Sequence, residues 1–234
     1  MSKLKRSYEN VIMILLLLPL IYFFHKPNDF WSDSSLLFFF IAGVVISVIG
    51  IFIRVWARHF KANTKGCLAE DSLYGYTRNP MYVASFLIGL GLSFAICNAW
   101  LILGYSFVFI LMHHLIILRE EKYLKKTYGQ SYIDYMEKVP RWIPKFSSKV
   151  KSSINSQTDI SSKNLFNAFI KEGNPIFGNI LLFLLIGFTA RFKHGFSFDT
   201  KEYMILACII CLWIVSEVTL IVMKNKTKKA QKSV

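Results

Sequence analysis

The stretch from Tyr82 to Leu118 contains no Asp, Glu, Lys or Arg, and its apolar run is broken at the pair Cys97-Asn98. A helix needs about 20 mostly apolar residues to cross a hydrocarbon core about 30 Å thick. The stretch is long enough for two such helices joined by a tight turn, Tyr82–Ile96 and Ala99–Leu118. The segment therefore predicts a helical hairpin inside a bilayer.

The composition of the whole chain agrees with a membrane location. Hydrophobic residues make up 54% of the 234 residues, and the formal net charge is +14. A soluble domain is typically about 45–50% apolar, less than this chain. A basic nucleic-acid binder carries its charge on a water-exposed face, which a chain this apolar does not favour. The aromatic content excludes disorder, and four cysteines exclude a disulfide scaffold. We therefore expect a membrane protein whose cations flank its spans, without a nucleic-acid partner.

Four further segments are candidate spans. Leu36–Trp56 and Tyr203–Met223 are long and apolar, whereas Val11–Phe24 and Ile176–Ala190 are shorter. The basic residues before Val11 also fit a signal peptide, but no small-residue cleavage site follows, so we expect a retained helix. The prediction is an all-α, multi-pass transmembrane bundle of about six spans.

Charge predicts how these spans are oriented. If the six spans alternate, 24 of the 28 Lys and Arg residues fall on one side and four on the other. The positive-inside rule then places both termini in the cytoplasm. We expect this membrane to be a bacterial inner membrane or the endoplasmic reticulum, with the cell membrane favoured. The basic linker and tail should attract anionic lipid headgroups.

The chain divides into three expected parts. Residues 1–146 form the membrane core, with Arg119–Lys138 predicted as a separate amphipathic helix that Pro140 ends. Residues 147–174 are a Ser/Lys-rich linker with a short interfacial segment. Residues 175–234 contain two more spans and a basic tail.

A first cluster of chemistry-bearing residues precedes the hairpin. It contains Tyr74 and the run Arg78-Asn79-Pro80-Met81-Tyr82. Pro80 fits the first turn of the following helix, which leaves free N–H groups at a helix N-terminus. Such a site, with Arg78 beside it, suits a carboxylate or phosphate. The alternative is a helix start with a flanking positive-inside arginine.

A second cluster, Arg119-Glu120-Glu121, follows the hairpin. Adjacent carboxylates at a bilayer surface repel each other and need a cation nearby. His113 and His114 lie on the same helix one to two turns earlier. A His–Glu pair is weak support for a metal, so none is assigned. In other spans we interpret Gly89 and Gly91 as helix-packing residues and Cys208 and Cys211 as filler rather than a redox pair.

Taken in order across the hairpin, the two clusters resemble the motifs of the isoprenylcysteine carboxyl methyltransferase and phosphatidylethanolamine N-methyltransferase superfamily. The run Arg78–Tyr82 and the pair Glu120-Glu121 match the first and second motifs. Further matching positions follow at Leu124, Tyr128-Gly129, Tyr132, Tyr135, Val139-Pro140-Arg141 and Pro144. The resemblance covers roughly residues 50–146 and leaves the last two spans outside.

The resemblance implies an integral-membrane methyltransferase that uses S-adenosylmethionine without a Rossmann domain. In that family the cofactor lies at the cytosolic membrane face, closed over by the segment after the hairpin. Glu120, with Glu121, should face the cofactor from one side. The residues expected to line the pocket from the other side are Leu68, Tyr74, Asn79, Pro80, Met81 and Tyr82. Carboxylates suit the ammonium or ribose hydroxyls, and tyrosines suit the adenine and sulfonium.

The expected reaction is direct in-line methyl transfer to a lipid-borne or otherwise hydrophobic acceptor. An amine acceptor must first lose a proton, and Glu121 and His113 are the candidate bases. A phosphate or carboxylate acceptor needs only a cation, for which Arg78 and Arg119 are candidates. The arginine that binds a prenylcysteine carboxylate in the family corresponds to Ile116 here, which disfavours that acceptor.

Other departures and rival functions remain open. Ser72 stands where the family has glycine, Asn79 where histidine is common, and Gly66 where animal members have a cofactor-binding histidine. The rival enzyme is an NADPH-dependent membrane reductase of the sterol-reductase type. A non-enzymatic membrane subunit with the same fold is the other rival. Each of these three functions is compatible with a homo-oligomer.

Overall fold

The computed structural model describes residues 33–63, 68, 72–145 and 162–193, together with 215, 218 and 219. Its elements are α2 (Asp33–Asn63), the short 3-10 turn η1 (Ser72–Gly75), α3 (Pro80–Ala95), α4 (Ala99–Tyr128), α5 (Gln130–Lys138) and α6 (Ser162–Lys193). The described residues are helical, as predicted, and contain no strand. The predicted first span, most of the last span and the pair Cys208 and Cys211 lie outside the described residues.

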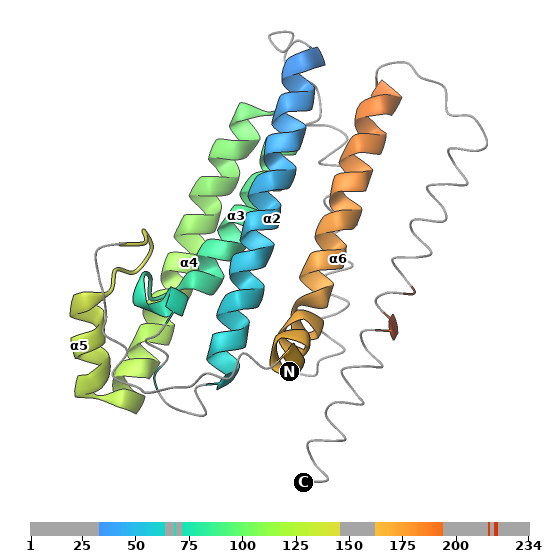
Figure 1. Ribbon diagram of the computed structural model, residues 1–234. Coiled ribbons are helices and arrows are strands. Elements are labelled where there is room, and N and C mark those ends of the chain that lie inside the picture. The colour runs from blue at the N-terminus through green and yellow to red at the C-terminus, as the bar shows by residue number, and fades with distance from the viewer. Residues whose placement is uncertain are drawn as a thin grey trace.

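The predicted hairpin is present as the antiparallel helices α3 and α4, and α3 packs along α2 (Figure 1). Its turn falls at Ile96–Asn98, and Cys97 has a positive φ of 56°. The side chain of Asn98 caps α4, because its Oδ1 accepts the Leu101 N–H at 3.1 Å. The polar pair that interrupts the apolar run therefore makes the turn.

α4 differs from the prediction at its C-terminal end. The sequence predicts a separate amphipathic helix over Arg119–Lys138, but α4 continues without a break through Arg119 to Tyr128. The break comes at Gly129, whose φ of 57° lies in the region that favours glycine. Helix-forming residues follow Leu118, so nothing ends α4 at the membrane boundary. The prediction of one separate helix is wrong, and the amphipathic part is divided between α4 and α5.

Small residues bring α2 and α3 into close contact. A Cβ on Gly91 would meet the backbone oxygen of Gly43 and the side chain of Ser47. Ser47 is buried, and its Oγ donates to the carbonyl oxygen of Ile88 at 2.9 Å. Close approach through glycine and serine is typical of helix pairs in membranes. The interpretation of Gly91 as a packing residue is confirmed.

We expect Gly91→Ala to destabilise the protein by about 1–3 kcal/mol, since the added methyl group would overlap the backbone of α2. Thermal unfolding in detergent measures this as a lower Tm. Gly104→Ala is the matched control, because a Cβ there meets nothing within 4 Å and alanine is the better helix former. An unchanged Tm in Gly91→Ala would contradict the close packing.

α6 packs along α2 and α3 (Figure 1). It begins at Ser162, in the segment expected to be a linker with a short interfacial part, and runs unbroken through the predicted span at Ile176. Ile186 packs with Ala95 and Ile96 at one end of the bundle. At the other end Glu172 is 1% exposed and forms ion pairs with two arginines of α2. These contacts allow the polar start of α6 to dock as a helix.

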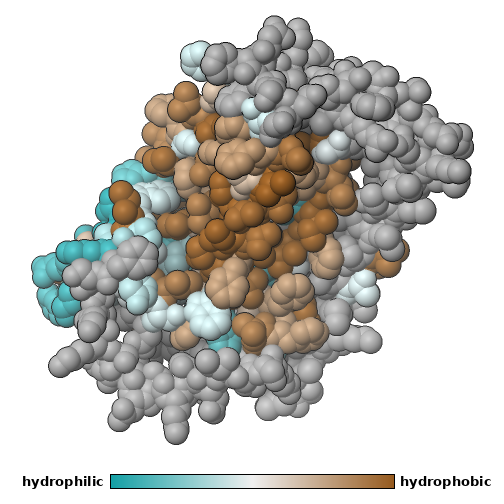
Figure 2. Space-filling model, turned by 45° about the horizontal axis from the view of Figure 1, so that its top comes forward, coloured by the Kyte–Doolittle hydropathy of each residue, from teal (hydrophilic) through white to brown (hydrophobic). Residues whose placement is uncertain are grey.

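Two of the helices are long and apolar enough to cross a membrane, over Ser35–Lys61 and Ala99–Tyr128. Only 17% and 6% of their most apolar windows are buried, unlike the core helix of a soluble protein. Figure 2 shows a broad apolar face with hydrophilic residues gathered at one side. We call the polar end the end of the bundle where α2 and α4 finish and α3 and α6 begin (Figure 1).

Candidate functional site

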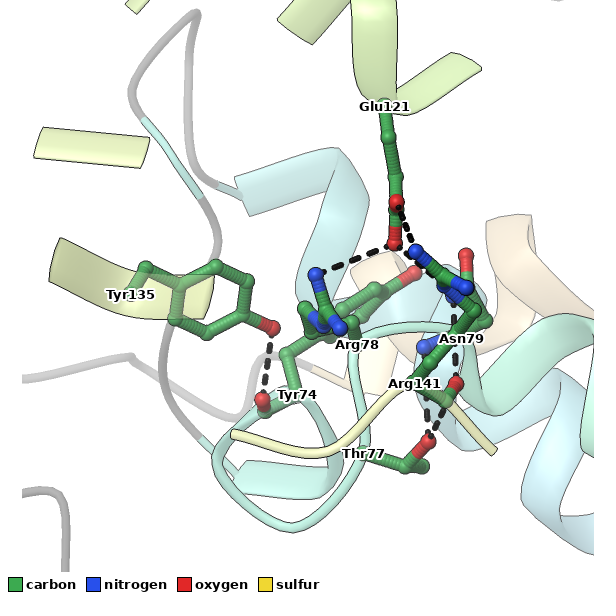
Figure 3. A network of polar contacts seen from close by, with 7 residues as sticks. All are labelled: Tyr74, Thr77, Arg78, Asn79, Glu121, Tyr135 and Arg141. Atoms are coloured by element: carbon green, nitrogen blue, oxygen red, sulfur yellow. Dashed lines mark hydrogen bonds and ion pairs between the residues drawn. The ribbon is translucent and has the colours of Figure 1, made fainter. Parts of the chain in front are cut away.

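The two predicted clusters meet at the polar end. The hydroxyl of Tyr82, in the first turn of α3, donates to Glu120 Oε2 on α4 at 3.1 Å. Arg78 Nη1, just before α3, lies 3.0 Å from Glu121 Oε1 (Figure 3). Residues about 40 positions apart are thus joined by two polar contacts. The prediction that the turn before the hairpin approaches the acidic pair after it is confirmed.

Glu121 is the centre of a buried ion cluster. Its side chain is 6% exposed, and Arg141 binds it through Nε to Oε1 at 3.0 Å and Nη2 to Oε2 at 2.7 Å. This hydrogen bonding to Glu121 raises the pKa of Arg141. With Arg78 on the same carboxylate, both oxygens of Glu121 are engaged. The expected cation is present, and it is a pair of arginines from separate segments.

The segment after α5 closes over the turn before α3. Arg78 N–H donates to the carbonyl oxygen of Pro140 at 2.9 Å, and Lys145 N–H donates to that of Tyr76 at 3.0 Å. The side chains of Thr77 and Asn79 both donate to the Arg141 carbonyl at 3.2 Å (Figure 3). Asn79 therefore anchors the closing segment and does not cap α3 with its side chain.

Tyrosines from α5 complete this closure. Tyr132, Tyr135 and Val139 form a buried cluster against which Leu68 packs. The hydroxyl of Tyr135 donates to the Tyr74 carbonyl at 2.7 Å (Figure 3). Burial raises the pKa of Tyr74 and of Tyr132, so both stay neutral at physiological pH. Leu68 and Tyr74, both predicted at the site, are therefore held by α5.

The start of the turn explains one departure from the family pattern. Ser72, where the family has glycine, has a φ of 57°, in the left-handed region that glycine adopts most readily. The indole N–H of Trp56 on α2 donates to Ser72 Oγ at 3.1 Å. The serine keeps the turn conformation and adds a bond to α2.

Glu120 is the carboxylate of the pair that stays accessible. Its side chain is 36% exposed, and its Oε1 lies 3.9 Å from Lys61 Nζ, a long and weak ion pair. The remaining predicted residues lie close by: Pro80 is buried at the first position of α3, and the Met81 carbonyl accepts the Ser85 hydroxyl at 2.9 Å. The ring of His113 contacts that of Tyr82, with centroids 5.4 Å apart. Arg119 is exposed.

Sequence reasoning missed the charges that attach α6. Glu172 accepts from Arg54 Nε and Arg58 Nε, each at 2.5 Å, and Arg54 also donates to Ser85 Oγ. Sequence reasoning also assigned no partner to Arg141. The signal available was the placement of acidic residues beside apolar runs, which requires neutralisation but does not name the partner. The partners are known only from the fold, which brings Arg54 and Arg58 to Glu172 and Arg141 to Glu121.

Comparison with known proteins agrees with the motifs. Residues 35–131 match the family model of phospholipid methyltransferases. A fission yeast protein named protein-S-isoprenylcysteine O-methyltransferase is 37% identical over 36% of this chain and 36% of its own length. A Xenopus laevis protein of the same name is 30% identical over 33% of this chain and 27% of its own length. The central part of the chain is therefore similar to phospholipid methyltransferases and to protein-S-isoprenylcysteine O-methyltransferases.

A further relative is the nickel-cobalt-cadmium resistance protein NccN of Alcaligenes xylosoxydans xylosoxydans, 26% identical over 58% of this chain and 63% of its own length. The chain thus spans less than two thirds of each of these relatives. No solved structure matches it. The family match ends at residue 131, so α6 lies beyond it.

Proposed function

We propose that the protein is an integral-membrane methyltransferase that transfers a methyl group from S-adenosylmethionine to a lipid-borne or otherwise hydrophobic acceptor. The observation that carries this proposal is the joining of Tyr82 to Glu120, and of Arg78 to Glu121, across the hairpin. Both pairs lie within the segment that matches the phospholipid methyltransferase family. The site lies at the end of apolar helices, which in a bilayer would bring it to the depth of the lipid headgroups.

The residues present fit this cofactor. Glu120 offers a partly exposed carboxylate, which suits an ammonium group or ribose hydroxyls, and Tyr82 fixes its orientation. Aromatic rings beside it suit adenine and a sulfonium. The residues proposed to hold the cofactor are Leu68, Tyr74, Asn79, Pro80, Met81, Tyr82 and Glu120. The cofactor would supply a methyl group already activated on sulfur.

The geometry changes the roles proposed for Arg78 and Glu121. Arg78 pairs with Glu121, and Glu121 is also bound by Arg141, so both side chains take part in holding this cluster together. We assign both as positioning residues that hold the turn before α3 against α4. Alignment of two substrates in this way contributes up to about 7–11 kcal/mol in favourable intramolecular reactions.

We expect Glu120→Gln and Tyr82→Phe each to weaken S-adenosylmethionine binding about 10–100-fold, since each removes a hydrogen bond that involves a charged group. Calorimetry on purified protein in detergent measures the Kd. Glu137→Gln is the matched control, because Glu137 is exposed on α5. Binding of NADPH in place of S-adenosylmethionine would support the reductase, and binding of neither would support the non-enzymatic subunit.

A further inference from the structure

Two rows of exposed apolar side chains on α4 continue into cations. Residues seven apart lie on nearly the same side of an α-helix, because seven residues make about two turns. The first row is Val108, Leu115 and Lys122, and the second is Met112, Arg119 and Lys126. All six side chains are exposed, and Figure 1 shows α4 continuing past the start of α3. The face of α4 that would contact lipid therefore becomes basic at the polar end, and we call Arg119, Lys122 and Lys126 the basic stripe.

The carboxylates of α4 lie on its other side. Glu120 accepts the hydroxyl of Tyr82 on α3, and Glu121 is buried and bound by Arg78 and Arg141. Both carboxylates are therefore directed toward the turn before α3, whereas the cations of the basic stripe face outward. α4 is described over its full length, and neither of its carboxylates lies on the side of the basic stripe.

The basic stripe has no counter-charge within the described part of the chain. The arginines that bind Glu121 and Glu172 are each paired with a carboxylate, but no ion pair among the described residues includes a cation of the stripe. The helix dipole favours Lys126, which lies in the last turn of α4, but Arg119 and Lys122 lie before that turn. The dipole therefore does not account for Arg119 and Lys122, and a counter-charge from outside the chain would.

The stripe begins at the depth of the lipid phosphates when α4 crosses a bilayer. Each headgroup layer extends roughly 5–7 Å beyond the hydrocarbon. Arg119 directly follows the exposed apolar residue Leu118, and Lys122 lies about 4.5 Å further along the helix axis. Lys126 lies about 6 Å beyond Lys122, and its long side chain can reach back to the same layer. The depth, the charge and the orientation of the stripe thus match those of phosphate groups in the bilayer.

We propose that the basic stripe binds the phosphate groups of acidic membrane phospholipids, whose acyl chains lie along the apolar rows of the same face. A guanidinium offers paired N–H donors to a phosphate, and a lysine offers a compact positive charge. This surface is distinct from the basic linker and tail, and it goes beyond the proposed function because it involves neither cofactor nor acceptor. Since Glu120 and Glu121 lie on the other side of the same turns, a phosphate bound here also fixes the depth of the candidate site.

The test measures phospholipid binding to the full-length protein in detergent by native mass spectrometry. The probes are dioleoyl phosphatidylglycerol and dioleoyl phosphatidylcholine, which share acyl chains and differ in net charge, and we expect phosphatidylglycerol to bind more tightly. Lys122→Gln should weaken phosphatidylglycerol binding about fivefold, and Arg119→Gln combined with Lys122→Gln about 30-fold, the usual attraction of one and two cations near an anionic surface. Equal affinity for the two lipids, or unchanged affinity in the double variant, would overturn the proposal.

Two control variants separate the stripe from overall charge and from misfolding. Lys138→Gln removes an exposed cation from α5, outside the stripe, and should leave phosphatidylglycerol affinity nearly unchanged. Arg119→Lys combined with Lys122→Arg keeps both charges and should retain most of the affinity. The Tm without added lipid should stay the same in every variant, because the replaced side chains are exposed. An equal loss of affinity in Lys138→Gln and Lys122→Gln would attribute binding to overall charge and overturn the proposal.

A competition experiment distinguishes a lipid phosphate from a free anion. Inorganic phosphate at the concentration of the lipid should leave phosphatidylglycerol bound, because the acyl chains also contact the apolar rows. Displacement of the lipid under these conditions would show that the stripe binds a free anion and would overturn the assignment of a membrane lipid. Failure of the protein to bind S-adenosylmethionine would overturn the proposed function and leave this proposal standing.

Discussion

Replacing Glu121 by alanine is expected to lower the free energy of unfolding by about 3–5 kcal/mol and to abolish S-adenosylmethionine binding. The reason is that Arg78, whose side chain is 10% exposed, would be left buried without its counter-charge. In thermal unfolding of the detergent-solubilised protein the loss corresponds to a fall in Tm of about 10 °C. Calorimetry on the same sample measures the Kd for S-adenosylmethionine.

Two variants separate the buried cluster from ordinary loss of charge. Glu137→Ala removes an exposed glutamate from the neighbouring helix and should leave Tm within about 1 °C. Arg141→Ala keeps the Arg78–Glu121 pair and should be milder than Glu121→Ala, since the Arg141 side chain is 29% exposed. Equal Tm values for Glu121→Ala and Glu137→Ala would show that the cluster does not hold the turn.

The local features of this fold could be predicted from the sequence. The hairpin follows from the length of the uncharged run, and its turn follows from Asn98, a capping residue at the break in that run. The approach of the turn at Arg78 to Glu121 follows from electrostatics, because a carboxylate pair beside a membrane needs a cation. These inferences depend on residues that lie close together in sequence or on motifs with fixed spacing.

The features that could not be predicted depend on partners far apart in the chain. Arg119 and Arg141 carry the same charge and both follow the predicted span Ala99–Leu118 in the sequence, yet Arg141 binds Glu121 and Arg119 is exposed. Only the reversal at Gly129 brings α5 and the following segment back over the turn. Hydrophobic periodicity indicates which face of a helix is apolar, and it does not indicate where the helix ends when no breaker is present.

The polar end contains two separate ion clusters. One, around Glu121, joins the turn before α3 to α4 and to the segment after α5. The other, around Glu172, joins α6 to α2 and, through Arg54, to Ser85 on α3. The first lies within or next to the family-matched region, whereas Glu172 lies beyond it. Their loss should therefore have separable consequences.

Glu172→Ala is expected to destabilise the protein by about 3–5 kcal/mol while leaving S-adenosylmethionine affinity within about threefold. The carboxylate is 2% exposed and is bound by Arg54 and Arg58, which would lose their shared counter-charge. Thermal unfolding in detergent gives the first quantity, and calorimetry below Tm gives the second. A large loss of cofactor affinity would show that α6 forms part of the cofactor site.

A rescue experiment identifies the physical cause of that destabilisation. If the cost arises from unpaired buried charge, the triple variant Arg54→Met, Arg58→Met and Glu172→Met should recover most of the lost stability. Apolar side chains of similar volume often replace a buried ion cluster without loss, because three desolvated charges are removed together. If the triple variant is instead as unstable as Glu172→Ala, the directional bonds from Arg54 and Arg58 are what fix α6 against α2, and apolar contact at this end cannot replace them.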